Sequence, residues 1–358
     1  MVYLRLLVLS AAVTFGLVWA WVAAMPMAFM DPEYASWRAK QVMLDRCDLG
    51  EAIILGDSRA AAGILPDRLP FSATNLAVGG GEAIEAYAAL ARALACPSPP
   101  KRVIISFDPG HFTRPDLFWE RSVRFGFLSA ADIDGLRDAS RRIGDMSIYE
   151  AHHTDGLPSA LRDALFRVRF PSLYFASLAH GGGFLRWSRN RTILQDATAA
   201  RGQYYFGTGQ GSAAVALEGH MDAFRPLPIL DHYFETLLTL LDQHGLESHF
   251  FAMPVNEATW KQVHPAVHEQ FGAYLAAYER RHPRFHVTAD IMPHWPDRFF
   301  GDQFCHLNPE GAERFTAQLA QRLQDAPPST RNEAQNGWLS DTGPDASARL
   351  LPVSKRGS

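Results

Sequence analysis

The chain has 358 residues, of which 47% are hydrophobic and 20% charged, and its formal net charge is −4. These values fit one large globular domain or two smaller ones, and they exclude a wholly disordered chain. Because a mildly acidic chain lacks the basic footprint that nucleic acids require, we expect no nucleic-acid partner.

The first thirty residues differ from the rest of the chain. Residues 6–24 carry no charge and are almost entirely apolar, which is long enough to cross about 30 Å of hydrocarbon as a helix. Arg5 precedes this run and Asp31 follows it, which favours a cytoplasmic N-terminus. We therefore expect residues 1–30 to anchor the chain in the cytoplasmic (inner) membrane by a single pass, with the body in the periplasm or another extracytoplasmic space. The alternative is a cleaved signal peptide, since residues 22–24 form an acceptable cleavage site.

Export makes the three cysteines informative, because disulfides form in oxidising compartments. Cys47 comes just before the first predicted strand, and Cys96 comes just before another apolar strand. If these strands are neighbours in a parallel sheet, both thiols lie at the same edge of it. The sequence therefore predicts a Cys47–Cys96 disulfide, worth roughly 4 kcal/mol in the chain-entropy model. Cys305 would be unpaired.

Short apolar runs alternate with helical patterns over most of the remaining chain. We expect strands over 52–55, 74–78, 102–107, 248–253 and 285–288. We expect helices over 34–44, 82–94, 260–281 and 309–324. This alternation predicts the α/β class, with a five-stranded parallel, flavodoxin-like sheet between helices on both faces in a three-layer α/β/α arrangement.

The range 112–247 shows no convincing parallel strand and is dense in aromatic residues and arginine. We expect a long, mostly helical insertion here, after the third strand, over the carboxyl edge of the sheet, with residues 203–207 as a loop or hairpin wall. Residues 31–325 then form one domain. The polar stretch 326–358 is typical of a disordered tail.

A candidate nucleophile follows the first strand, in the sequence Gly56-Asp57-Ser58. A serine at the carboxyl end of a central parallel strand lies where α/β sheets hold ligands. If a helix starts directly behind Ser58, its backbone N–H groups and dipole favour an anion there. The alternative interpretation is that Asp57 or Ser58 only caps that helix.

A candidate base stands in the loop before the last predicted helix. His306 has an acidic residue, Asp302, four positions earlier. This pairing suits a general base and the group that orients it. The alternative is that His306 is an ordinary surface-loop residue.

Taken together, these blocks resemble the SGNH/GDSL hydrolase superfamily over residues 50–325. The matching residues, in chain order, are Gly56-Asp57-Ser58, then Asn75 and Gly80, then Asp302, His306-Leu307-Asn308 and Gly311. The resemblance implies that Ser58 is the nucleophile, that His306 is its base and that Asp302 orients the imidazole. It also implies an oxyanion hole formed by the backbone N–H groups of Ser58 and Gly80.

Two positions depart from the pattern of the superfamily. Its aspartate stands three residues before the histidine, but this chain has Gln303 there and Asp302 one position earlier. Either a bulged loop brings Asp302 to the imidazole, or a Ser–His dyad operates. The third block of the superfamily supplies an asparagine as oxyanion donor, whereas the equivalent strand end here carries Asp108 and His111. Either His111 or a residue of the insertion takes that place.

The anchor, the insertion and the variant third block resemble one branch of the superfamily. Its members are membrane-anchored proteins that assist O-acylation of cell-envelope or exported polysaccharides, alginate-acetylation and DltD-like proteins among them. This implies an O-acetyltransferase or acetylesterase that forms an acyl-Ser58 intermediate, acts on a polysaccharide or acyl ester, and works beside a membrane-bound O-acyltransferase. We expect no cofactor and no metal.

Two other functions stay open at this point. The first is a non-catalytic assembly factor that binds polysaccharide or a protein partner, and the second is a simple secreted carboxylesterase or lipase. Trp119, Trp187 and Tyr204 are candidates for stacking on sugar rings, although core packing is the commoner role of such residues.

Overall fold

A five-stranded parallel sheet organises the first of two compact units, Met1–Ala320 and Gln321–Ser358. The computed structural model describes the whole chain except residues 116, 151–160, 162–163, 167–182, 288–289 and 326–358. The expected disordered tail therefore lies outside the described residues.

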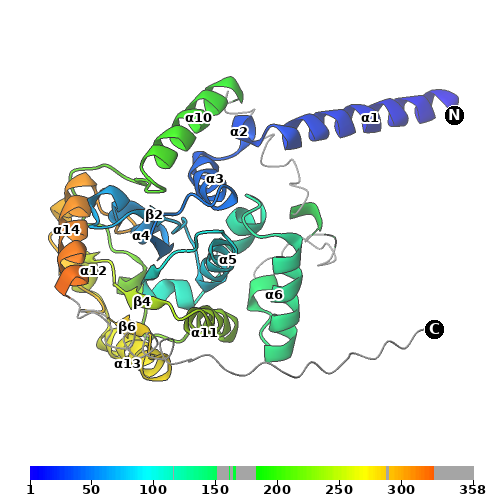
Figure 1. The fold of residues 1–358 in the computed structure, drawn as a ribbon. Coiled ribbons are helices and arrows are strands. Elements are labelled where there is room, and N and C mark those ends of the chain that lie inside the picture. The colour runs from blue at the N-terminus through cyan, green and yellow to red at the C-terminus, as the bar shows by residue number, and fades with distance from the viewer. Residues whose placement is uncertain (116, 151–160, 162–163, 167–182, 288–289, 326–358) are drawn as a thin grey trace, which may run out of the picture. The chain divides into compact units, whose positions relative to one another are not determined.

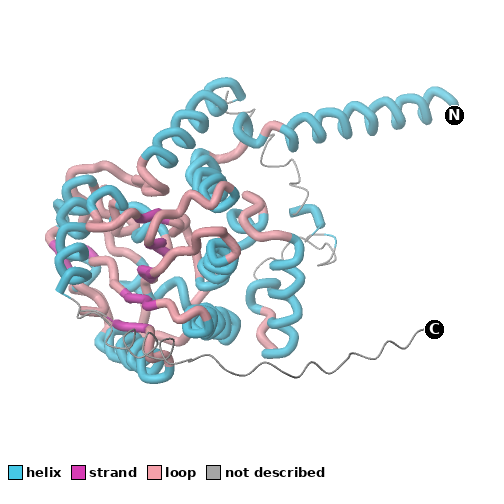
Figure 2. Tube along the Cα trace, viewed as in Figure 1, coloured by secondary structure: helices cyan, strands magenta, loops and turns pink. Residues whose placement is uncertain are grey.

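The sheet has the strand order β2-β1-β3-β4-β6, and every pair is parallel. Its strands are β1 (Ala52–Gly56), β2 (Ala73–Asn75), β3 (Arg102–Ser106), β4 (Glu247–Phe250) and β6 (Phe285–Val287). Helices flank it, as Figures 1 and 2 show, so the predicted mixed α/β class and the five parallel strands are confirmed. All of β1 is buried, which explains its unbroken apolar sequence. Two further short strands, β5 (Val255–Asn256) and β7 (His294–Trp295), form a separate parallel pair.

Strand β2 ends at Asn75, earlier than the expected 74–78, although the N–H groups of Leu76 and Val78 still donate hydrogen bonds to carbonyl oxygens of β1. The amide of Asn75 is buried and donates hydrogen bonds to the carbonyl oxygens of Ala60 (2.9 Å) and Ile64 (3.0 Å). Its Oδ1 accepts a hydrogen bond from the N–H of Ala77 at 3.1 Å. Asn75 therefore connects the end of β2 to the short helix that follows β1.

Four expected helices are present, with one wrong boundary. They are α3 (Pro32–Asp45), α5 (Ala83–Leu94), α13 (Pro265–Arg281) and α14 (Pro309–Asp325). The expected helix 260–281 is instead split into α12 (Glu257–Trp260) and α13. Proline lacks the N–H that an interior helical position needs, so α13 starts at Pro265, with the His264 side chain as its cap.

The range 112–247 contains short helical segments and one helix that belongs to the sheet. The described elements are η3 (Phe118–Val123), α6 (Ala130–Ile143), α7 (Ser147–Glu150), α10 (Gly183–Ala199), η5 (Leu217–His220) and α11 (Pro228–Gln243). Because α11 packs on α5 and leads directly into β4, it serves as a crossover helix and not as a cover over the sheet edge. Residues 203–207 form a loop and not a hairpin.

The N-terminal helix α1 (Val2–Ala24) is long and apolar enough to cross a membrane, and it is almost entirely exposed. A signal sequence would share these properties. The short helix α2 (Pro26–Phe29) follows at once, and the rings of Trp21 and Phe29 meet edge to face at 5.1 Å between centroids.

A disulfide joins the predicted pair, Cys47 and Cys96, whose Cα atoms are 5.5 Å apart. Cys47 follows α3 and Cys96 follows α5, so the bond links two helices that flank the sheet. Cys305 is free and buried.

Replacing both Cys47 and Cys96 by serine should lower the free energy of unfolding by about 4 kcal/mol, because the unfolded chain regains the entropy of an open loop of roughly 50 residues. Chemical denaturation of the detergent-solubilised chain measures this difference. The untouched protein under reducing conditions should match the double variant. Equal stability of oxidised and reduced protein would contradict the prediction.

Candidate active site

The carboxyl end of β1 positions Ser58 through the side chain of Asp57. Asp57 is fully buried, and its Oδ1 accepts hydrogen bonds from the N–H groups of Arg59 (2.8 Å) and Ala60 (3.2 Å), which caps the helix α4 (Ser58–Gly63). Its Oδ2 accepts a hydrogen bond from the N–H of Asp108 at 2.8 Å. The helix-cap interpretation therefore holds for Asp57, and it leaves Ser58 as the first helical residue. Since α4 has only six residues, N–H groups rather than a long dipole would act on an anion here.

Glycine is required at position 56, because β1 and β3 approach closely at this point. A Cβ added to Gly56 would lie 2.0 Å from the carbonyl oxygen of Ser106 on β3. The strand can therefore end directly against its neighbour, with Asp57 and Ser58 at the rim.

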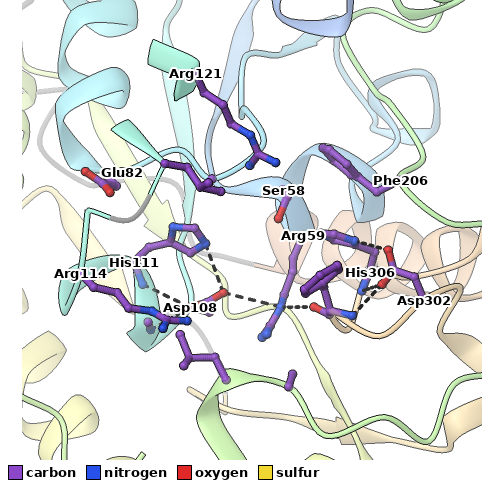
Figure 3. A pocket seen from close by; sticks show the side chains of 16 residues that line it. Ser58, Arg59, Glu82, Asp108, His111, Arg114, Arg121, Phe206, Asp302 and His306 are labelled. Carbon is purple, nitrogen blue, oxygen red and sulfur yellow. Dashed lines mark hydrogen bonds and ion pairs between the residues drawn. The ribbon is translucent and has the colours of Figure 1, made fainter. Parts of the chain in front are cut away.

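One cavity of about 610 Å³ is lined by all the predicted catalytic and oxyanion-hole residues. Its lining includes Ser58, Gly80, Asp108, His111, Asp302 and His306. Figure 3 shows Ser58, His306 and Asp302 towards one end of this cavity and His111 and Arg114 towards the other. Residues from the range 112–247 also line it, among them Leu117, Arg121 and Phe206.

Asp302 reaches the imidazole of His306 in spite of the unusual spacing. Its Oδ2 lies 2.6 Å from Nδ1 of His306, and its Oδ1 accepts hydrogen bonds from the N–H groups of Phe304 (2.9 Å) and His306 (3.3 Å). The bulged-loop alternative is thus the one that forms. Burial alone would raise the pKa of Asp302, but the hydrogen bonds and the charge of His306 outweigh burial and lower that pKa. The side chain is therefore an anionic partner for Nδ1 at neutral pH.

The loop between Asp302 and His306 contains one unusual backbone conformation. Cys305 has φ = 60°, in the left-handed region that residues other than glycine seldom adopt. Around it, Gly301 donates to the carbonyl of His306 at 2.8 Å, and Asn308 donates to the carbonyl of Phe299 at 2.9 Å. These bonds close the loop and hold the imidazole in place.

The other nitrogen of His306 has no hydrogen-bond partner among the described residues. His306 is 5% exposed, and its Nε2 is buried. The ring of Phe206 stacks on the imidazole with centroids 4.6 Å apart and planes 26° from parallel. A buried nitrogen without a hydrogen-bond partner lowers the stability of the folded protein. A role in binding a hydroxyl or a substrate is one explanation for such an atom.

Gly80 lies in a loop that is contacted by two charged side chains, Arg121 and Lys40. Its φ is +68°, and a Cβ there would lie 2.7 Å from Nη1 of Arg121, so a larger residue would be both strained and crowded. Nη2 of Arg121 forms an ion pair with Oε2 of Glu33 at 2.7 Å. Beneath the loop, the buried ammonium of Lys40 donates a hydrogen bond to the carbonyl of Ala77. Burial lowers the pKa of Lys40 to about 7, although the nearby Glu33 opposes that shift.

Asp108 and His111 line the cavity, but Asp108 cannot act as a hydrogen-bond donor through its carboxylate. Its Oδ1 accepts from the N–H groups of Gly110 (2.7 Å) and His111 (3.3 Å). Nε2 of His111 lies 3.5 Å from Oδ2 of Asp108. One possible metal-ligand atom from each of Asp57, Asp108 and His111 lies within 4.8 Å of the other two, a spacing that could hold a metal ion. Both carboxylates, however, already receive backbone N–H groups or the charge of Arg59.

Arg59 is a site residue that the sequence analysis missed. It forms a bidentate ion pair with the fully buried Glu218, with N–O distances of 2.6 and 2.9 Å. Its Nε donates a hydrogen bond to the carbonyl oxygen of Phe304 at 3.1 Å. Its Nε also lies 3.6 Å from Oδ2 of Asp108. Arg59 thus connects α4 to η5, to the strand end at Asp108 and to the loop of His306. The sequence did contain a signal for this residue, because Arg59 stands between Ser58 and three alanines in a segment that is expected to be buried. A buried arginine requires an acidic partner, which here is Glu218.

The aromatic candidates for sugar stacking lie elsewhere. Trp119 is 2% exposed and donates from Nε1 to the carbonyl of Ile148 at 2.7 Å, so it belongs to the core. Neither Trp187 nor Tyr204 lines the cavity.

Comparison with known proteins assigns no family. A scan against protein-family models finds no match, and a search of curated proteins finds none. The function is therefore inferred from the cavity itself.

Replacing Arg59 by methionine should destabilise the protein by about 3–5 kcal/mol, because Glu218 would remain buried without its partner. Replacing Glu218 by leucine should cost a similar amount. The double variant should lose less than the sum of the two, which a double-mutant cycle by chemical denaturation measures. The exposed pair Arg141–Asp138 is the control, and its loss should cost about 0–1 kcal/mol. Strictly additive costs for Arg59 and Glu218 would contradict the pairing.

The stability of the wild type should rise with pH between about 7 and 10.5 relative to a Lys40→Met variant. In this window the unfolded chain holds a proton on Lys40 that the folded chain has lost, so raising the pH favours folding. The slope is at most about 1.4 kcal/mol per pH unit. Unfolding curves at several pH values measure it, and Lys101→Met, which removes an exposed lysine, should leave the wild-type profile unchanged. A pH-independent difference between wild type and Lys40→Met would count against a buried titrating ammonium.

Proposed function

We propose that this protein is a serine-dependent acyl-transfer enzyme in which Ser58 is the nucleophile and His306 its general base. The observation that carries the proposal is the buried Nε2 of His306, which has no described hydrogen-bond partner while Nδ1 is held by Asp302 at 2.6 Å. A carboxylate on Nδ1 fixes the tautomer that leaves Nε2 as a proton acceptor. Ser58 lines the same cavity, and its hydroxyl is the group that this nitrogen would deprotonate once the two come into hydrogen-bond contact.

The reaction would run in two halves. Ser58 Oγ attacks the ester carbonyl while its proton passes to Nε2 of His306, and a tetrahedral oxyanion forms. The N–H groups of Ser58 and Gly80 stabilise that oxyanion, each worth roughly 3–4 kcal/mol of barrier. His306 then protonates the leaving alkoxide, and the acyl group remains on Ser58. In the second half, the acceptor hydroxyl, from water or a sugar, gives its proton to Nε2 of His306 and attacks the acyl-Ser58 carbonyl. His306 then returns the proton to Ser58 Oγ, and the acylated acceptor leaves.

The residue pattern also supports placement in the SGNH/GDSL superfamily, with a three-layer α/β/α fold and an insertion between the third and fourth strands of the sheet. The proposed branch is the membrane-anchored one that O-acylates cell-envelope or exported polysaccharides next to a membrane-bound O-acyltransferase. Two features support an extracytoplasmic location. One is the apolar helix α1, and the other is the Cys47–Cys96 disulfide, since such bonds persist in oxidising compartments.

The cavity walls bear on the choice between transferase and esterase. Leu117, Leu217 and Phe304 supply apolar surface for an acyl group, while Arg114 and His111 supply polar atoms for an acceptor. Phe206 covers one face of His306 and limits the access of water to the imidazole. These features favour transfer of a short acyl group to a sugar hydroxyl over plain hydrolysis.

Replacing Ser58 by alanine should lower turnover of p-nitrophenyl acetate by roughly 10³-fold or more, because the covalent step is lost. His306→Ala should fall to a similar residual rate. Asp302→Asn should cost up to about 10⁴-fold in kcat, since the amide favours the wrong tautomer. The assay uses the full chain in detergent, with release of p-nitrophenolate as the readout.

Ser98→Ala is a matched control, because Ser98 is exposed and lies outside the cavity, and it should retain full activity. Equal, negligible rates in the wild type and Ser58→Ala would contradict the catalytic proposal and favour a non-catalytic binding protein. Efficient hydrolysis of long-chain esters would instead favour a simple lipase-like esterase.

A further inference from the structure

Helix α10 is bonded to the segment that follows the membrane-type helix α1. The side-chain amide of Asn190 is fully buried and donates hydrogen bonds to the carbonyl oxygens of Met27 and Met30, both at 3.0 Å. One turn earlier, Arg186 donates to the carbonyl of Phe29 at 3.3 Å. Helix α10 also packs on α3, and Figure 1 shows it beside α2 and α3.

These bonds fix how far α10 can lie from the end of α1. Helix α1 ends at Ala24, and Met27 is three residues further along the chain. Three residues span at most about 10 Å. The polar layer of a bilayer is roughly 5–8 Å deep on each side of the hydrocarbon. If α1 spans the membrane to its last residue, residues 186–190 of α10 are held close to the headgroup layer.

The exposed part of this helix has the chemistry of a membrane surface. Residues 183–195 contain three arginines and no acidic residue, and the first carboxylate is Asp196. Arg189 and Arg191 are exposed, and Trp187 is 40% exposed. The guanidinium of Arg191 lies over the Trp187 ring, 5.4 Å from its centroid. Tryptophan and arginine are the residues that favour the boundary between headgroups and water.

We propose that the exposed face of α10 that carries Trp187 and Arg191, with Arg189 on its flank, binds the anionic headgroups of the bilayer that α1 enters. The proposal requires α1 to span the membrane, and it does not depend on the chemistry of Ser58. Lipid is the occupant because the face is cationic, carries an interfacial aromatic ring and is bonded to the residues that leave the span. Two contacts of the catalytic unit with the bilayer, α1 and α10, would then fix its orientation, which a single flexible tether would not.

The full chain in lipid nanodiscs tests this proposal. The discs contain phosphatidylcholine alone or mixed with phosphatidylglycerol, and part of the lipid is brominated near the headgroup. The readout is quenching of Trp187 fluorescence, taken as the difference between wild type and Trp187→Phe. Each arginine near an anionic surface should shift the docking equilibrium by about fivefold. Quenching should therefore be strong in phosphatidylglycerol discs and fall several-fold with Arg189→Glu/Arg191→Glu or with high salt.

The matched control is Lys101→Glu/Arg280→Glu, which reverses two exposed charges outside α2, α3 and α10, and it should quench like the wild type. Circular dichroism and an intact Cys47–Cys96 bond verify that each variant folds. Equal quenching in both lipid mixtures, unaffected by the α10 variant, would overturn the proposal. So would docking that appears only with an acidic protein partner. Esterase activity is measured separately, so its absence leaves this result interpretable.

Discussion

The buried carboxylate of Asp57 is the contact on which the candidate site depends. It receives N–H groups from the first turn of α4 and from Asp108 at the end of β3, so it joins two neighbouring strand ends at the cavity rim. A buried carboxylate tolerates this position because three N–H groups replace its water shell. Ser58 follows Asp57 directly, so the position of its hydroxyl is set by the same bonds.

The remaining parts of the site are brought to this rim by polar contacts between segments that are distant in sequence. Arg59 holds the loop of His306 and the segment around Glu218 against α4. Phe206 packs on the imidazole, and Arg121 supports the loop of Gly80 through Glu33. Buried polar networks of this kind fix geometry when every member is satisfied. Nε2 of His306 is a buried atom of this cavity that has no hydrogen-bond partner among the described residues.

The sequence was sufficient to predict the five strands of the main sheet, the helices α3, α5 and α14, and six of the residues that line the cavity. Apolar runs and glycines mark strand ends, and parallel strands present those ends at one edge, so Ser58 could be placed there. Its pairing with His306 was implied by the resemblance of the two sequence blocks to the SGNH/GDSL superfamily. The partners of Arg59 could not be predicted, because Glu218 lies 159 residues away in a segment without periodicity. Nor could the bonds of the Asn75 side chain to Ala60 and Ile64, because these partners lie on another segment of the chain.

The left-handed conformation of Cys305 has a consequence for how such sites are recognised in sequences. Cys305 lies between Asp302 and His306, in a loop that brings the carboxylate to 2.6 Å from the imidazole with three residues between them. A text pattern that demands two intervening residues would pass over this chain, while one that allows three would find it. The distance between the carboxylate and the imidazole decides how they interact, and the number of residues between them in the sequence does not.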